Sequence, residues 1–186
     1  YIMNTVVTSR TAILEASRQL IREKGWSALN IRSVAGACGV SVGSIYNYFN
    51  SKADLMAAAV ESIWCDIFHF SDGNAFDSFT EGIQWVFDSL EKGEQKYPGF
   101  FALHSVGFEA GEKTGGQQLM AQSWEHMRRG FCMVMAQDKK IRKDAFDESF
   151  TREMLAELVF SLILANMLQK KYDSSSILEM VRRLIY

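Results

Sequence analysis

Proline, cysteine and long apolar runs are all scarce in this sequence. Pro98 is the single proline among 186 residues, and the 13 glycines are scattered along the chain. A protein built from β-strands needs many tight turns, and turns are rich in proline and glycine, so this composition disfavours an all-β fold. Long stretches instead repeat apolar residues with helical spacing. The sequence therefore predicts an all-α fold of about nine helices.

The signatures of membrane and secreted proteins are also missing. The longest apolar candidate, Leu158 to Leu168, is interrupted by Ser161 and Asn166, whereas crossing a bilayer takes roughly 18 apolar residues. No signal-peptide pattern is visible. The three cysteines are an odd number and lie within apolar helical patterns, which is typical of a reducing compartment. We expect a cytoplasmic protein with no membrane partner.

Charge is unevenly distributed along the chain. Residues 1–52 contain six Lys or Arg and two Glu, a net charge of +4, whereas the remaining residues have a net charge of −6. A weakly basic part joined to an acidic remainder is typical of a nucleic-acid-binding unit attached to a second unit. We therefore expect any contact with nucleic acid to lie near the N-terminus.

Residues 25–55 have the pattern of a helix, a tight turn and a second, shorter helix. Asn30 is predicted to cap the first helix, whose buried face has the spacing i, i+3, i+4, i+7 in Ile31, Val34, Ala35 and Cys38. Gly39 suits the left-handed backbone that ends a helix. The second helix is predicted to begin after Ser41.

The outer side of the second helix has the residue types that suit a phosphate backbone. Ile45 and Phe49 are expected to point inward, which leaves Gly43, Ser44, Tyr46, Asn47 and Tyr48 on or near the outer side. Glycine allows close approach of a backbone, free N–H groups at a helix start bind anions, and uncharged side chains add hydrogen-bond donors. Lys52 supplies a cation at the start of the next helix. The pattern indicates contact with duplex DNA.

This segment resembles the DNA-binding domain of the TetR family of transcriptional regulators, and residues 9–55 follow the family pattern. The matching residues are Gly25, Ile31, Val34, Ala35, Gly39, Val40, Ser41, Gly43, Ile45, Tyr46, Tyr48, Phe49, Ser51, Lys52 and Leu55. Two positions depart from that pattern. Val42 stands where the family often has a cation that reaches a base, so contact with a thymine methyl is the alternative. Ser33 stands where a carboxylate would complete a capping box.

The resemblance implies a division of the chain and a function. Residues 1–51 would form a three-helix helix-turn-helix domain, and residues 52–186 a helical domain for effector binding and dimerisation. We expect a repressor that binds a palindromic operator in double-stranded DNA as a homodimer and is released by an unidentified small apolar or aromatic effector. No enzymatic activity, cofactor or metal site is expected. The residues assigned to DNA contact are Arg32, Ser41, Val42, Gly43, Ser44, Tyr46, Asn47, Tyr48 and Lys52.

The rest of the chain is punctuated into further helices. The patterns predict helices at about 9–24, 52–70, 147–172 and 174–186, with others around Phe76 to Leu90, from Pro98 and after Gly116. The helix at 147–172 is apolar nearly all the way round, so it needs cover on every side. It is either fully buried in a monomer or covered by a second copy, and the family dimerises through its last two helices. The predicted interface consists of Leu155, Leu158, Val159, Leu162, Ile163, Asn166, Val181 and Leu184.

Aromatic and methionine residues in the second domain have two interpretations. At helical spacing they form either an ordinary core or the lining of an apolar pocket with a few polar groups. Because family members bind small effectors between these helices, the predicted lining consists of Trp64, Phe68, Gln84, Phe101, His104, Phe108, Met120, Trp124 and Met127.

Two other classes of function are weighed against a regulator. Cys65 and His69 have the i, i+4 spacing of metal ligands, and Asp66 with His69 is the one carboxylate-x-x-His pattern. A core cysteine and a boundary histidine explain these residues more simply. The second alternative is a helical interaction protein without sequence-specific DNA binding, which Val42 keeps open. The basic stretch at residues 138–144 is expected to be a solvated loop.

Overall fold

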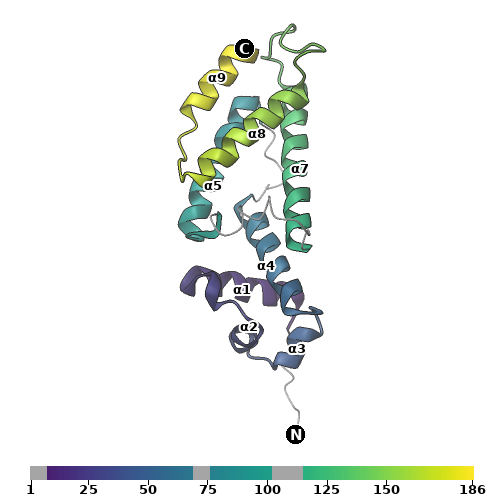
Figure 1. The fold of residues 1–186 in the computed structure, drawn as a ribbon, viewed down its shortest axis with the longest axis vertical. Helices are drawn as coiled ribbons and strands as arrows, with labels where there is room; N and C mark the ends of the chain where they lie inside the picture. The colour runs from purple at the N-terminus through teal and green to yellow at the C-terminus, as the bar shows by residue number, and fades with distance from the viewer. Residues whose placement is uncertain (1–7, 69–75, 102–114) are drawn as a thin grey trace.

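A computed structural model describes residues 8–68, 76–101 and 115–186, with side chains from residue 122 onward in the last range. These residues form eight α-helices, one short 3-10 helix and no strand, so the all-α prediction is confirmed (Figure 1). The helices are α1 (Arg10–Lys24), α2 (Ile31–Cys38), α3 (Val42–Tyr46), α4 (Lys52–Ile67), α5 (Phe79–Lys96), α7 (Gly115–Gln137), α8 (Arg152–Leu168) and α9 (Ser175–Ile185). The 3-10 helix η1 is Trp26–Ala28. The helix predicted from Pro98 lies mostly outside the described residues.

The helices form two groups that α4 connects. Figure 1 shows α1, α2 and α3 together at the end that holds the N-terminus, and α5, α7, α8 and α9 at the opposite end. We call residues 8–51 the head and the described residues from 52 onward the body. Helix α4 packs against α1 in the head and against α7 and α5 in the body. It therefore belongs structurally to both groups.

Hydroxyl and amide side chains start most of the helices. Ser9, Ser41, Ser51, Ser78 and Thr151 each accept a hydrogen bond from the backbone N–H three residues further on. Such a bond satisfies one of the free N–H groups at a helix start. The predicted starts at Ser41 and Lys52 are thereby confirmed.

The start of α2 corrects one expectation from the sequence. Asn30 caps the helix as predicted, because its Oδ1 accepts from the Ser33 N–H at 2.9 Å. The Ser33 hydroxyl in turn accepts from the Asn30 N–H at 3.0 Å, so a capping box is complete without a carboxylate. At the other end Gly39 has φ +67, the left-handed conformation predicted for it, and the Val40 N–H bonds Ala35 O at 3.0 Å.

Helix α8 is shorter than its predicted range of 147–172. Asp147 instead shapes a turn, in which its Oδ1 accepts from the backbone N–H groups of Ser149 and Phe150 at 2.7 and 2.9 Å. Thr151 then caps the helix. At the far end Lys170 has φ 54, which cannot continue a right-handed helix.

None of the helices in the described ranges is long and apolar enough to cross a membrane.

Side chains also join the head to α4 and to the end of α5. Arg18 on α1 donates to the Ser62 hydroxyl on α4 and pairs with Glu15 on its own helix. Trp26 in η1 packs against Phe100, with ring centroids 6.5 Å apart. The head therefore contacts the body through a polar link and an aromatic link.

Candidate DNA interface and body cavity

Helix α3, the second helix of the helix-turn-helix, is held from inside and presents large side chains outward. Helix α3 is only five residues long. Ile45 and Phe49 are 0% and 2% exposed and fix it to the core of the head. Val42, Tyr46 and Tyr48 are 39%, 49% and 39% exposed. Apolar and aromatic groups at this level of exposure are unusual within a small domain and indicate a contact surface.

The structure brings most of the predicted DNA contacts onto one surface. Residues 41–48 comprise the cap of α3, the helix itself and the two residues that follow it. All of them except Ser44 and Ile45 are exposed. Ser44 is half-buried, and its N–H and its hydroxyl both lie within hydrogen-bond distance of Ser41 Oγ, at 3.2 and 2.9 Å. Arg32, in the first turn of α2, and Lys52, at the start of α4, are also exposed.

Tyr48 has a structural contact that the sequence did not predict. Its hydroxyl donates to Thr8 O at 2.6 Å, and its own carbonyl accepts from Arg10 Nη1 at 3.2 Å. The Arg10 guanidinium also lies 4.5 Å from the centre of the Phe49 ring. Arg10 is therefore a cation fixed beside the α3 surface. It was not among the predicted contacts because it lies on the first helix, outside the helix-turn-helix residues from which most of those contacts were drawn.

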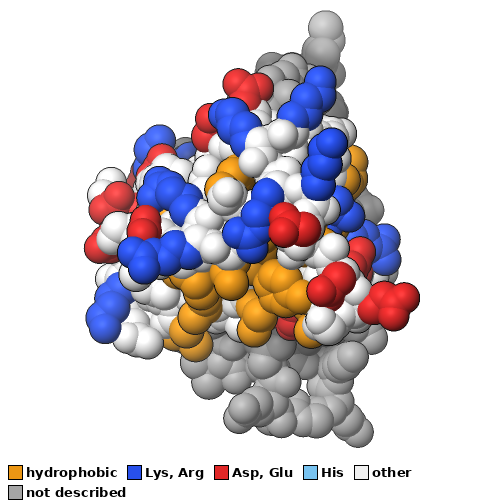
Figure 2. All heavy atoms as spheres, turned by 90° about the horizontal axis from the view of Figure 1, so that it is seen from above, with side chains coloured by type: hydrophobic (Ala, Val, Ile, Leu, Met, Phe, Trp, Pro, Cys, Tyr) orange, Lys and Arg blue, Asp and Glu red, His pale blue; other side chains and the backbone are white. Residues whose placement is uncertain are grey.

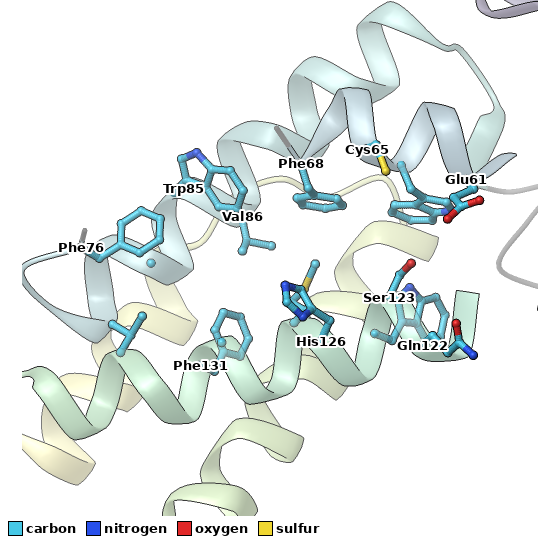
Figure 3. A pocket seen from close by; sticks show the side chains of 16 residues that line it. Glu61, Cys65, Phe68, Phe76, Trp85, Val86, Gln122, Ser123, His126 and Phe131 are labelled. Carbon is cyan, nitrogen blue, oxygen red and sulfur yellow. The ribbon is translucent and has the colours of Figure 1, made fainter. Parts of the chain in front are cut away.

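The body contains a cavity of about 430 Å³ between α4, α5 and α7 (Figure 3). This volume lies within the range of small-molecule sites. Most of its lining is apolar or aromatic. The lining residues are Glu61, Trp64, Cys65, Phe68, Phe76, Gly82, Trp85, Val86, Gln122, Ser123, Trp124, His126, Met127, Gly130, Phe131 and Val134.

The predicted lining agrees with this cavity in part. Trp64, Phe68, Trp124 and Met127 line it. Phe101 does not line it; the side chain is buried behind Trp64, with ring centroids 5.4 Å apart. His104 and Phe108 lie outside the described residues, as does the side chain of Met120.

Gln84 is not part of the cavity wall and corrects the prediction. Its Nε2 donates to Asp88 at 2.8 Å, and its Oε1 accepts from the Ser174 hydroxyl at 2.7 Å. The amide is therefore directed toward the start of α9. The next residue, Trp85, lines the cavity instead. Successive side chains on a helix point about 100° apart, so Trp85 faces the cavity while Gln84 faces away from it.

The electrostatics of the cavity are dominated by one acid. Glu61 is the one Asp, Glu, Lys or Arg in the described lining. Burial, and then the charge of Glu61, raise the pKa of the Cys65 thiol, so Cys65 stays a neutral thiol at pH 7. The described lining therefore contains no Lys or Arg that could pair with an anionic ligand.

The metal-site alternative finds no support in the described residues. They contain no group of three or more His, Cys, Asp or Glu able to hold a metal ion. Asp66 accepts from the Tyr97 hydroxyl at 2.6 Å and pairs with Lys96 at 2.7 Å. His69 lies outside the described residues.

The predicted dimer interface divides between the two sides of the last helices. Leu158, Leu162 and Leu184 are 52%, 36% and 37% exposed, so they are available to a partner. Asn166 is half-buried and donates to Leu162 O. Met154 and Leu168, which were not among the predicted interface residues, are also exposed.

The burial of four predicted interface residues contradicts their assignment to the interface. Leu155, Val159, Ile163 and Val181 are at most 2% exposed within a single protomer. They pack in the protomer's own core and have no surface left for a partner. Helix α8 is apolar on both sides, and only tertiary contacts decide which side is inside.

The end of the molecule opposite the head carries mixed charges. Figure 2 shows Lys and Arg side chains interspersed with Asp and Glu there. Arg142 lies 3.6 Å from Asp144, and Arg183 lies 2.8 Å from Glu179. This arrangement is typical of a solvated surface. A continuous basic surface, which nucleic acid would require, is not seen on this face.

The head matches a known family of DNA-binding proteins. Residues 13–59 match the family model described as bacterial regulatory proteins, tetR family. The chain is 33% identical over 85 residues to the HTH-type transcriptional regulator AlkX of Mycobacterium tuberculosis, which covers 42% of this chain and 40% of that protein. Residues 13–59 are therefore similar to the N-terminal part of TetR-family regulators. The HTH-type transcriptional repressor KstR2 of Rhodococcus jostii is 32% identical over 59 residues, 32% of this chain and 29% of that protein.

The TetR fold extends over the body as well. The transcriptional regulator SCO7222, a TetR from Streptomyces coelicolor, superposes with a TM-score of 0.63 at 19% identity, over 88% of this chain and 72% of that chain. The structure of BioQ with its double-stranded DNA operator gives 0.57 at 16% identity, over 88% and 86% of the two chains. The chain spans about two fifths of AlkX and less of KstR2. Sequence similarity to these two relatives thus covers only part of their length.

Proposed function

We propose that this chain is a TetR-family transcriptional repressor that binds a palindromic operator as a homodimer and is released when a small molecule occupies the body cavity. The observation that carries the proposal is the surface of α3. Val42 and Tyr46 are exposed on a helix whose opposite side is fixed by Ile45, and the exposed Tyr48 follows two residues after that helix ends. Packing alone gives no reason for an exposed Tyr46 beside an exposed valine. Operator DNA, and hence the repressor, is expected in the cytoplasm.

The chemistry of this surface suits DNA backbone and base edges. Tyr46 and Asn47 offer uncharged donors to phosphate oxygens, and Lys52 and Arg10 offer cations. Val42 suits the methyl group of a thymine in the major groove. Contacts to phosphates hold the protein in register, and contacts to bases select the sequence.

The remaining parts of the molecule suit regulation of that contact. The cavity is large enough for an effector and lies against α4, which begins at Lys52 beside the α3 surface. The exposed apolar side chains Met154, Leu158 and Leu162 on α8, together with Leu184 on α9, give a homodimer interface. A palindromic operator requires such a twofold arrangement, with half-sites one helical turn apart.

The proposal is tested by binding to an inverted repeat. The probe is a fluorescent duplex that contains the inverted repeat nearest the start of the gene, and the competitor is the same duplex with both half-sites scrambled. We expect tighter binding to the repeat by at least about 10³-fold at physiological salt. Val42→Ser, which removes the proposed contact with a thymine methyl, should reduce the preference, whereas Met133→Ala, at a position 63% exposed on α7, should keep it. Equal affinity of the wild type for both duplexes would refute the proposal.

A further inference from the structure

The cavity in the body has two chemically different ends. Figure 3 shows Phe76, Trp85 and Phe131 at one end and Glu61, Gln122 and Ser123 at the other. The lining residues on α7 extend from Gln122 to Val134. At 1.5 Å per residue this distance along the helix is roughly 18 Å. The cavity therefore suits an elongated ligand with one apolar end and one polar end.

The polar end repels anions. Glu61 makes no ion pair with the described residues, and the described lining contains no Lys or Arg. Arg18 on the neighbouring helix α1 donates to Glu15 and Ser62. A carboxylate or phosphate placed beside Glu61 would be desolvated next to a like charge, without a counterion.

The polar end also holds an unused hydrogen-bond donor. Trp64 is 6% exposed and lines the cavity, and its indole N–H has no acceptor among the described residues. A buried N–H without a partner is costly and is normally satisfied by protein, water or ligand. Trp64 lies three residues after Glu61 on α4, so the two side chains are on neighbouring turns of one helix. An acceptor for a ligand proton and a donor for a ligand oxygen therefore lie on adjacent turns of α4, and a ligand reaches the buried donor by displacing the Trp64 ring.

We propose that the effector is an elongated amphiphile with an aromatic or aliphatic body and an uncharged head group that both donates and accepts hydrogen bonds. A primary carboxamide or a hydroxyl is such a head. Its N–H or O–H donates to Glu61, and its oxygen accepts from the Trp64 indole. The apolar body lies along α7 toward Trp85 and Phe76. This inference rests on the proposed regulatory function and specifies the ligand class of that cavity.

Two isosteric probes test the charge of the head group directly. They are 4-phenylbutanamide and 4-phenylbutanoate, which have the same body and nearly the same shape and differ in charge at pH 7.5. Calorimetry on the full chain should show that the amide binds at least about tenfold more tightly than the carboxylate. Glu61→Gln should bring the ratio of the two affinities close to one. Glu91→Gln, an exposed acid on α5 outside the cavity, should leave the ratio unchanged.

A third probe separates the hydrogen bond of Trp64 from its packing. Trp64→Phe keeps an aromatic ring but removes the N–H, so the amide should lose about fivefold in affinity. Butylbenzene, which has no head group, should bind this variant and the wild type equally. Equal losses for both probes would assign Trp64 to packing alone and remove it from the proposal.

The outcomes distinguish this inference from the proposed function. Tighter binding of the carboxylate, an unchanged ratio in Glu61→Gln, or no binding of any of the three probes would overturn the ligand class. Operator affinity is measured separately on the same preparation without a probe. A protein that prefers its inverted repeat but selects the wrong head group remains a repressor with a different effector. A protein that selects the amide but ignores the repeat has the cavity as proposed and another function.

Discussion

At the scale of single residues, exposed side chains of the head are divided between two roles. Tyr46 points into solvent without a hydrogen bond to the described residues, whereas the Tyr48 hydroxyl is bonded to Thr8 O. A phenol already donating a proton can still accept one, but it cannot donate to a phosphate. We therefore expect Tyr46 to contact phosphate directly and Tyr48 to position the start of the chain beside Arg10.

Lys52 gives the first prediction, because a cation on phosphate releases counterions. Lys52→Ala should weaken binding to operator and to scrambled duplex by the same factor. The slope of log affinity against log salt should fall by about one unit. Fluorescence anisotropy between low and moderate salt measures both quantities. Lys139→Ala, in the exposed loop far from the head, is the matched control. An unchanged slope for Lys52→Ala would show that this lysine does not contact DNA.

At the scale of elements, the start of α5 depends on the end of the chain. The Phe79 N–H donates to Asp138 Oδ2 at 2.9 Å, and the Tyr186 hydroxyl donates to the same carboxylate. Burial alone would raise the pKa of Asp138, but the bonds from Tyr186, Phe79 and Lys140 outweigh it and lower that pKa below 3.8. Burial, and then the bond to Asp138, raise the pKa of Tyr186 to about 12. Tyr186 therefore keeps its proton at neutral pH.

The second prediction concerns this carboxylate and its dependence on pH. Tyr186→Phe should lower the free energy of unfolding by about 1–2 kcal/mol at pH 7, because a bond to a buried charge is lost. Since the folded-state pKa of Asp138 is depressed, the stabilisation is present above its unfolded pKa and is lost as pH falls through the folded value. The difference between wild type and variant should thus shrink below about pH 4. Urea titrations at several pH values measure it. A difference that grows on acidification would contradict this assignment.

The third prediction uses the two sides of α8. Leu158→Glu, on the exposed side, should give a folded monomer, whereas Ile163→Glu, at 2% exposure, should unfold the protomer. Light scattering gives the mass, and circular dichroism gives the helix content. The wild type should be a dimer at micromolar concentration. A monomeric wild type, or a dimeric Leu158→Glu, would exclude this side of α8 as the interface.

The head was more predictable than the body because its signals are local. Gly39, Ser41 and Asn30 specify a turn and two caps through contacts within four residues, so the chain order alone is informative. In α8, by contrast, Leu158 and Val159 are equally apolar neighbours, yet one is half exposed and the other is buried. That choice is made by the packing of α8 against other helices, foremost α7, and not by anything within α8 itself. In the same way, packing between helices decides that Trp85 lines the cavity and that its neighbour Gln84 does not. The hydroxyl of Ser33 was underestimated because capping rules favour a longer carboxylate at that position.

At the scale of the whole molecule, the cavity and the α3 surface share α4. The helix has 16 residues, which corresponds to roughly 22 Å between Lys52 and Ile67. A second connection runs through aromatic rings, from Trp26 in the head to Phe100 and then to Trp64 in the cavity wall, with centroids 6.5 and 5.6 Å apart. A ligand that displaces Trp64 therefore acts on the head through two links.

The fourth prediction is that this coupling is reciprocal. If an effector lowers operator affinity, saturating operator must lower effector affinity by the same factor, on the order of 5 to 150. Calorimetry of 4-phenylbutanamide with and without operator measures that factor. Trp26→Leu should reduce it without changing the affinity of the probe for the free protein, because the aromatic link is broken while the cavity stays intact. Equal affinities with and without operator in the wild type would show that cavity and operator are independent.

The positions of the four tryptophans make the protein its own optical reporter. Three of them, Trp64, Trp85 and Trp124, line the cavity, and the fourth, Trp26, lies where the head meets Phe100. Ultraviolet excitation therefore yields emission from the ligand site and from the junction at once, with no attached dye. The spectrum of a Trp26→Phe variant contains the cavity signal alone. Its difference from the wild type isolates the junction, so ligand entry and movement of the head become two separately timed signals in a single stopped-flow experiment.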